Sequence, residues 1–317
     1  MASYGHSTGN DMTAALFTEP RFNDDTAARE HLEALRWPNG AVCPHCGGAD
    51  RQSALEGKAH RAGVYFCGHC RSQYTVTVGS VFESSKVPLH KWVLATHLIC
   101  SSKKGISAKQ LERTLSVTYK TAWFMAHRIR EAMNIASEGT LGGAGQPVEA
   151  DETYWGNVGK QQPGARGGDH KMKIVSLVER NGQKRSFHVA DVTAATVKGV
   201  LKEHVAKNSR LMTDESPIYV KVGREFLEHG TVNHSAKEYA RGYIMTNTVE
   251  SSFAILKHGL YGKFHSVSEQ HLQRYVTEFD FRWNTRQKLG FSDTDRAAEA
   301  LKNIGGKRLT YRRIGCQ

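Results

Sequence analysis

The chain has 317 residues, which is enough for two or three compact domains. Its 43 lysines and arginines outnumber 31 aspartates and glutamates, and the net charge of +12 favours a polyanionic partner such as nucleic acid. No run of about 18 apolar residues is present, which argues against a transmembrane helix. The polar residues 1–11 lack the pattern of a secretory signal, so we expect a cytoplasmic protein.

The first 82 residues are expected to comprise a flexible N-terminus, 1–21, and a region with a short helix and a cysteine-rich module, 22–82. Asn23 or Asp24 can cap the helix, and the turn at 37–40 (WPNG) ends it. The β-branched stretch 74–78 predicts a strand. Apolar residues recur at helical spacing between the cap and the turn, at Ala28, Leu32 and Leu35.

Two CxxC pairs, Cys43 with Cys46 and Cys67 with Cys70, are separated by 20 residues. Four thiolates at this spacing are typical of one tetrahedral structural zinc ion, and Gly47 and Gly48 allow a tight turn after the first pair. Redox sites or disulfides are the alternatives, and the specific spacing of two CxxC pairs favours zinc over both. His45 and His69 are spare ligands that we expect to be exposed to solvent, and we expect Cys100 and Cys316, which lack partners in the sequence pattern, to be ordinary residues.

Residues 83–138 are predicted to form a helix-turn-helix domain. A helix over 107–115 is followed by a turn at 116–118, and Thr118 can cap a second helix over 119–133. A helical hairpin that only supports a core is the alternative. The expected buried seam consists of Leu111, Leu115, Val117, Ala122, Met125 and Ile129.

Charge favours DNA binding by this segment. Between residues 84 and 135 nine lysines and arginines face only two acids, Glu112 and Glu131. A second helix rich in basic and aromatic residues is typical of a recognition helix that enters the major groove. The nine cations are Lys86, Lys91, Lys103, Lys104, Lys109, Arg113, Lys120, Arg128 and Arg130. The predicted DNA-binding residues are Lys109, Lys120, Thr121, Trp123, His127 and Arg130.

A glycine-rich linker, 139–147, precedes a domain over 148–290, and a C-terminal tail, 291–317, follows it. The pattern in the domain predicts strands over 148–152, 173–179, 185–190 and 211–213, and helices over 194–206, 248–258 and 268–284. This order describes an α/β fold with helices packed on a mixed sheet.

Three acids in this domain are candidate metal ligands. Asp151 and Asp214 each end an apolar strand, and Glu250 lies at the start of a helix that could pass the same sheet edge. Carboxylates suit Mg²⁺ or Mn²⁺, and two such ions can promote in-line displacement at phosphorus. Alternatively, the acids are solvated, and Glu250 belongs to a capping motif begun by Asn247. Other acids that could compete for the role are Glu149, Glu152, Glu215 and Glu238.

Residues 20–290 resemble bacterial insertion-sequence transposases of the DDE type, in particular the ISXO2-like transposase family. The resemblance is most specific at 35–40 (LRWPNG), 77–82 (TVGSVF), 149–154 (EADETY), 247–253 (NTVESSF), 261–265 (YGKFH) and 271–275 (HLQRY). His234 and His265 lie in family blocks, and we assign them no role.

The resemblance implies a ribonuclease H-like mixed sheet flanked by helices, with Asp151, Asp214 and Glu250 as ligands of magnesium or manganese and the four paired cysteines as zinc ligands. It also implies cleavage of DNA at the ends of a mobile element and attack of the 3′-hydroxyl on target DNA. A homo-oligomer that joins two ends and a nucleoid-associated location would follow. An inactive DNA-binding regulator and a metal-dependent endonuclease are the alternatives.

Overall fold

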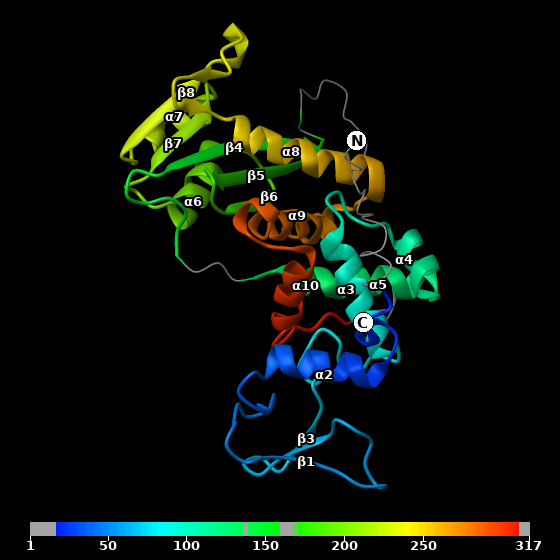
Figure 1. Ribbon diagram of the computed structural model, residues 1–317. Helices are drawn as coiled ribbons and strands as arrows, with labels where there is room; N and C mark the ends of the chain where they lie inside the picture. Colours follow the sequence, from blue (N-terminus) through cyan, green and yellow to red (C-terminus); the bar gives the residue numbers. More distant parts are fainter. Residues whose placement is uncertain (1–16, 136–138, 159–167, 169, 311–317) are drawn as a thin grey trace, which may run out of the picture. The chain divides into compact units, whose positions relative to one another are not determined.

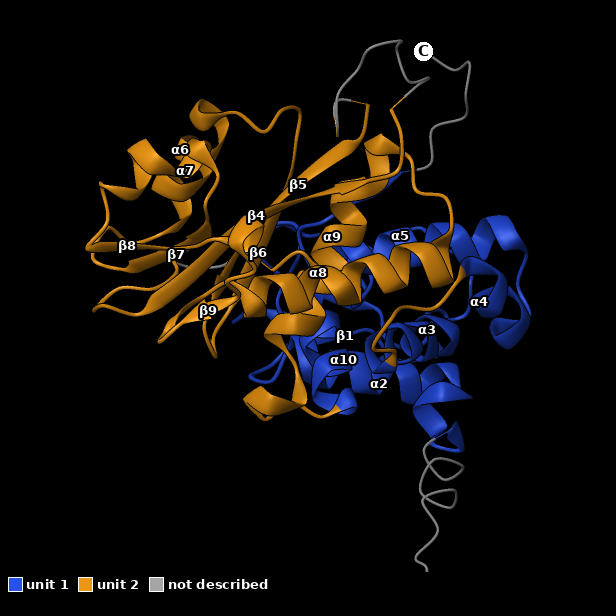
Figure 2. Cartoon of the chain, turned by 90° about the horizontal axis from the view of Figure 1, so that it is seen from above, with its two compact units in different colours: residues 1–101, 108–132, 293–317 blue, residues 102–107, 133–292 orange. Residues whose placement is uncertain are grey.

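The computed structural model describes residues 17–135, 139–158, 168 and 170–310 (Figure 1). The chain divides into two compact units (Figure 2). Unit 1 comprises residues 1–101, 108–132 and 293–317, and unit 2 comprises 102–107 and 133–292. No helix in the described residues has the length and hydropathy needed to cross a bilayer.

Unit 1 contains a helical part. The Asp24 side chain accepts a hydrogen bond from the Ala27 amide and caps the predicted first helix, α2. The segment expected as a C-terminal tail contains α10, which packs against α2 and α3. Its inward residues are Ala297, Ala300 and Leu301. The elements are η1 (Pro20–Phe22), α2 (Asp25–Arg36), α3 (Leu89–Ser101), α4 (Ala108–Leu115), α5 (Tyr119–Met133) and α10 (Asp293–Lys302).

The cysteine-rich part of unit 1 forms a small antiparallel sheet, β1 (Gln52–Ala54), β2 (Tyr65–Cys67) and β3 (Gln73–Tyr74). The strand predicted over 74–78 is wrong beyond Tyr74. After the pair Tyr65–Tyr74 the chain turns, because the Val78 amide bonds to the Thr75 carbonyl instead of to a neighbouring strand.

Helices α4 and α5 confirm the two predicted helices and the turn between them. The Thr118 hydroxyl accepts a hydrogen bond from the Thr121 amide at the start of α5. In the expected seam Val117 is only partly buried, whereas the other members are buried: Leu111, Leu115, Ala122, Met125 and Ile129.

Unit 2 is built on a five-stranded mixed sheet in the order β6-β5-β4-β7-β8. β6, β5 and β4 are antiparallel, and β4, β7 and β8 are parallel. All four predicted strands are present, and β8 was not predicted. Its Gly230 lies so close to Met212 that a side chain would collide with it. The strands are β4 (Pro147–Trp155), β5 (Met172–Glu179), β6 (Lys184–Val189), β7 (Arg210–Asp214) and β8 (Glu228–Val232).

Helices cover both faces of this sheet. Val249, Phe253 and Leu256 of α8 pack with Ile174 and Val178 of β5 on one face, together with α9. Helices α6 and α7 pack on the other face. This arrangement confirms the predicted mixed α/β class. The helical elements are α6 (Ala194–His204), α7 (Pro217–Gly223), η2 (His234–Ala236), α8 (Asn247–Gly259), η3 (Leu260–Phe264), α9 (Glu269–Asn284) and η4 (Gln287–Leu289).

The glycine-rich segment 139–147 was expected to be a flexible linker, but it is held in unit 2. Leu141 is 2% exposed, its amide donates to the His204 carbonyl, and its carbonyl accepts from the Ala206 amide. A small hairpin, β9 (Ala240–Arg241) with β10 (Ile244–Met245), follows η2 and precedes α8.

Candidate functional site

The four cysteines of the paired CxxC motifs come together in unit 1. Their sulfur atoms all lie within 4.8 Å of one another, and Cys43–Cys70 and Cys46–Cys67 are both 3.6 Å apart. Each pair forms a tight turn, because the Gly47 amide donates to the Cys43 carbonyl and the Arg71 amide donates to the Cys67 carbonyl. Four thiol groups in this arrangement match the donor set of a structural zinc ion.

Backbone amides support the thiolate form of Cys67. The amides of Cys70 and His69 and the side-chain amide of Gln52 lower the pKa of this thiol to about 6. A thiolate is the form that binds zinc. His45 and His69 are exposed, as expected, and Cys100 is a buried free cysteine outside the cluster. Cys316 lies outside the described residues.

Asp151 and Asp214 lie on neighbouring strands of the unit 2 sheet. Asp214 ends β7 as predicted, but Asp151 lies in the middle of β4, which continues to Trp155. The expected strand end at Asp151 is therefore wrong. Parallel pairing of β4 with β7 ends at Glu149 and Met212, and the same register continued by two residues places Asp151 opposite Asp214.

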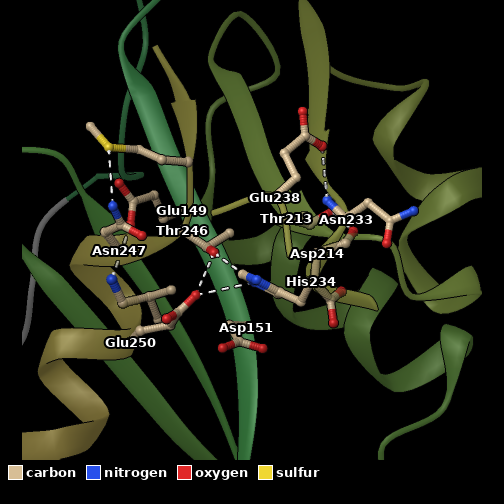
Figure 3. Close-up of polar contacts among 12 residues, drawn as sticks. Glu149, Asp151, Thr213, Asp214, Asn233, His234, Glu238, Thr246, Asn247 and Glu250 are labelled. Carbon is tan, nitrogen blue, oxygen red and sulfur yellow. Dashed lines mark hydrogen bonds and ion pairs between the residues drawn. The ribbon is translucent and has the colours of Figure 1, made fainter. Parts of the chain in front are cut away.

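The pleat of the sheet directs three acids to the face covered by α8. Val148 and Ala150 pack on the α6 and α7 side, so Glu149 and Asp151 face the opposite side. Asp214 shares that side because Leu211 faces α6 and α7. Glu250, in the first turn of α8, completes the group (Figure 3). Among the described residues, only the four cysteines gather their donor atoms within 4.8 Å, so the acids are spaced more widely.

Burial and neighbouring carboxylates raise the pKa of two acids in this group, Asp151 and Glu152. Burial, followed by the charges of Glu152, Asp214 and Glu250, raises the pKa of Asp151 to about 8. Burial and Asp214 also raise the pKa of Glu152, although the Tyr219 hydroxyl donates a 2.7 Å hydrogen bond to it. No described lysine or arginine is ion-paired with Asp151, Asp214 or Glu250. Clustered carboxylates without such a counter-ion suit a divalent cation.

His234 links the loop after β8 to α8. Its Nε2 lies 3.2 Å from Glu250 Oε1 and 3.3 Å from the Thr246 hydroxyl, which itself donates to Glu250 Oε1. Figure 3 shows His234 beside Glu250 and Asp151. Glu215 holds the His234 segment by accepting hydrogen bonds from the amides of His234 and Ser235. The hydrogen bond from the Ser235 hydroxyl, followed by the backbone hydrogen bonds, lowers the pKa of Glu215 to about 2.

Glu250 does not cap α8. The N-cap residue is Thr246, so Asn247 lies inside the helix and Glu250 lies one position beyond the glutamate of a capping box. The first amides of α8 donate instead to Glu149 of β4. The sequence pattern indicated Glu149 and Glu152 only as alternative candidates for the role of metal ligand. Their positions in the EADETY block were the one signal that both lie near Asp151.

The predicted DNA-binding residues do not share one surface. Lys109 and Lys120 are exposed, and Thr121 and Trp123 are partly buried. His127 is fully buried and Arg130 is 3% exposed, so their predicted outer positions are wrong. The last two turns of α5 are buried on several sides. The sequence prediction assumed that only one face of this helix is buried.

Comparisons with known proteins agree with both units. Residues 23–73 match the family model described as the transposase zinc-ribbon domain, and residues 140–284 match the ISXO2-like transposase domain. The chain is 28% identical over 307 residues to an uncharacterized protein in transposable element ISH50 of Halobacterium salinarum, covering 89% of this chain and 96% of that protein. Residues 140–284 therefore carry an ISXO2-like transposase domain, and a transposase zinc-ribbon domain over residues 23–73 precedes it.

Proposed function

We propose that this chain is an active DNA transposase that cuts DNA at the ends of an insertion sequence and joins the freed 3′-hydroxyl to target DNA. The observation that carries the proposal is the convergence of Asp151, Asp214 and Glu250 on one side of the sheet without a lysine or arginine counter-ion. Such a cluster raises the electrostatic energy of the metal-free protein, and a divalent cation relieves it.

Asp151, Asp214 and Glu250 would hold Mg²⁺ or Mn²⁺ through carboxylate oxygens. The bound ions would supply electrostatic stabilisation of the attacking and leaving oxygens at the scissile phosphate. His234 orients Glu250, since its Nε2 lies 3.2 Å from the carboxylate. Glu152 adds negative charge beside Asp151 and Asp214 and is itself held by Tyr219.

Helices α4 and α5 act as a helix-turn-helix that binds the element ends. Its exposed cations, Lys109, Arg113 and Lys120, contact the DNA, whereas the buried Arg130 supports the helix. The four cysteines hold a structural zinc ion that keeps the ribbon folded. Two copies of the chain act together when two element ends are joined. We infer that the catalytic domain is ribonuclease H-like, and its three antiparallel strands followed by two parallel ones support this proposal.

The test replaces each acid by its amide, as Asp151→Asn, Asp214→Asn and Glu250→Gln. Each variant should bind labelled element-end DNA normally in a gel shift but cleave it more than about 100-fold more slowly in Mg²⁺ or Mn²⁺. Glu238→Gln is the matched control, because this acid accepts a hydrogen bond from the Asn233 amide near the site and points away from Asp151 and Glu250 (Figure 3). It should cleave at the wild-type rate.

Cleavage and joining of element-end DNA by the wild-type chain distinguish the proposed transposase from the two alternatives. Wild-type cleavage without a joined product would assign an endonuclease, and end binding without cleavage in any metal would assign a regulator. If Glu250→Gln cleaves normally while Glu238→Gln does not, the third carboxylate is Glu238 and the proposed cluster is wrong.

A further inference from the structure

Glu149 is a fully buried carboxylate that joins β4 to the start of α8. Its Oε2 accepts hydrogen bonds from the amides of Thr248 and Val249, at 2.7 and 3.0 Å. Its Oε1 accepts from the Thr248 hydroxyl, at 2.8 Å. The side chain is completely inaccessible to solvent. A residue 99 positions before Thr248 therefore satisfies the free amides at the N-terminus of α8, where a negative charge is also favourable.

Arg180 completes this junction. Its Nε donates to Glu149 Oε1 at 3.0 Å. Its two terminal nitrogens donate to the carbonyls of Tyr243 and Met245, at 2.8 and 3.3 Å, in the segment that leads into α8. The guanidinium therefore neutralises the buried carboxylate and fixes the approach to the helix at the same time.

The junction lies next to two of the proposed metal ligands. Glu149 precedes Asp151 by two residues and faces the same side of β4, while Val249 directly precedes Glu250 in α8. One carboxylate thus ties the strand of one proposed ligand to the helix of another. A shift of α8 along or around its axis would move Glu250 relative to Asp151, and the Glu149 hydrogen bonds oppose that shift.

We propose that Glu149, neutralised by Arg180, is a positioning residue that sets the place of Glu250 relative to Asp151 and thereby the affinity of the site for its divalent cation. This inference rests on the proposed function. Loss of a residue that orients metal ligands typically lowers metal affinity about 10- to 100-fold. A role in folding alone would lower stability without changing that affinity.

Glu149→Gln is a sharp test, because each of the two carboxylate oxygens accepts two hydrogen bonds. An amide of the same shape must turn its NH₂ group toward one of these donor pairs. The measurement is Mn²⁺ binding to the full, zinc-loaded chain, followed through the electron paramagnetic resonance signal of free Mn²⁺. We expect the Kd for Mn²⁺ to rise about 10- to 100-fold.

Asp280→Asn is the matched control. Asp280 is another buried carboxylate of the same unit, it pairs with a buried cation, Lys184, and it holds α9 instead of the start of α8. This variant should lose thermal stability but keep the wild-type Kd for Mn²⁺. If Glu149→Gln also keeps the wild-type Kd while its stability falls, Glu149 has a structural role only and the proposal is overturned.

Two further variants keep the test decisive. Thr248→Val removes one hydrogen bond to Glu149 without touching its charge, so it serves if Glu149→Gln does not fold. It should raise the Kd in the same direction by a smaller factor, and an unchanged Kd would contradict the proposal. Asp151→Asn tests the site itself. If it leaves Mn²⁺ binding intact, the proposed function fails, whereas loss of binding in Asp151→Asn alone removes only the role of Glu149.

Discussion

Lys184 of β6 and Asp280 of α9 form an ion pair in the interior of the transposase domain. The Lys184 ammonium lies 3.4 Å from Asp280 Oδ1, and the Ser186 hydroxyl donates to the same oxygen at 2.8 Å. Burial lowers the pKa of Lys184 and raises that of Asp280, so the interior disfavours both charges even though they attract each other. The pair is therefore costly to break and of little net benefit when intact.

This balance predicts a strongly coupled double-mutant cycle. Asp280→Leu and Lys184→Met should each lower the free energy of unfolding by about 3–5 kcal/mol, because each leaves one buried charge without its partner. The double variant should be close to wild type, since apolar side chains of similar volume replace the pair. Urea denaturation of the full chain measures all four proteins. Additive losses in the double variant would show that the two residues act independently.

The sequence predicted three acids as metal ligands, but it could not assign roles to the other acids near them. Asp151, Asp214 and Glu250 follow from strand and helix patterns, and the structure places them on one side of the sheet. Glu149 lies on the same face of β4 as Asp151, so the strand periodicity alone predicts the same role for both residues. What separates them is a contact with amides 99 residues later in the chain, which no local pattern encodes.

Helix α5 illustrates a similar limit at the scale of elements. Its bounds and its capping residue followed from the sequence, but its outward residues did not. Ala122, Met125 and Ile129 give one buried stripe, and His127 and Arg130 are buried as well. A single stripe predicts one packing partner, whereas α5 is covered on several sides.

The corrected positions separate two effects of mutation. Lys120→Ala should weaken binding to element-end DNA and reduce the dependence of log Kd on log salt by about one unit, because one phosphate contact is lost. Arg130→Ala should instead lower stability, by about 0.5–3 kcal/mol, because it removes a buried side chain. Salt titrations of binding and thermal melts distinguish the two. If Arg130→Ala reduced the dependence of log Kd on log salt without loss of stability, Arg130 would be a DNA-contacting residue after all.

Helix α3 carries a buried histidine, His97, which packs against Phe22 with ring centroids 5.3 Å apart. Burial and then the charge of Arg21 lower the pKa of His97 from 6.5, while Asp293 and Glu19 act in the opposite direction. Between the folded pKa and 6.5, His97 therefore binds a proton in the unfolded chain but not in the folded chain. Its contribution to stability is complete above pH 6.5 and is lost as the pH falls below 6.5 toward the folded pKa.

His97→Phe should consequently reduce the loss of thermal stability between pH 7.5 and pH 5.5. The dependence should not disappear, because burial and Arg21 also lower the pKa of His31 in α2. Melts of zinc-saturated protein at both pH values give the measurement, and the exposed His60, replaced by glutamine, serves as the control. Equal pH dependence in wild type and His97→Phe would contradict the expectation.

At the scale of the whole molecule, unit 1 is assembled from three separate stretches of the chain. Its last helix, α10, was not predicted, although Ala297, Ala300, Leu301 and Ile304 recur at helical spacing and are all buried. The local signal was therefore present. What the sequence did not reveal is that the apolar face of α10 is covered by two helices from far earlier in the chain, α2 (Asp25–Arg36) and α3 (Leu89–Ser101).

The zinc ribbon has too small an apolar core to fold without a bound metal ion. Its strands have only two or three residues, and its buried apolar cluster is small: Cys43, Cys67 and Tyr74, with Trp37, Tyr65 and Val78 packed against it. So few apolar contacts cannot offset the conformational entropy of some 40 residues. Zinc binding, worth roughly 10–16 kcal/mol in small zinc modules, must supply most of the folding energy.

Removing zinc should therefore unfold the ribbon and leave the transposase domain folded. We expect one zinc ion per wild-type chain, loss of that ion in Cys67→Ser, and full retention in Cys100→Ala, whose thiol lies outside the cluster. Metal analysis counts the ion. Hydrogen exchange should show lost protection in β1 and β2 and unchanged protection in β4 and β5, because the sheet of unit 2 has its own two apolar cores. Wild-type protein without zinc, or normal zinc content in Cys67→Ser, would refute the assignment of the four cysteines. Global unfolding after chelation would instead show that the two units do not fold independently.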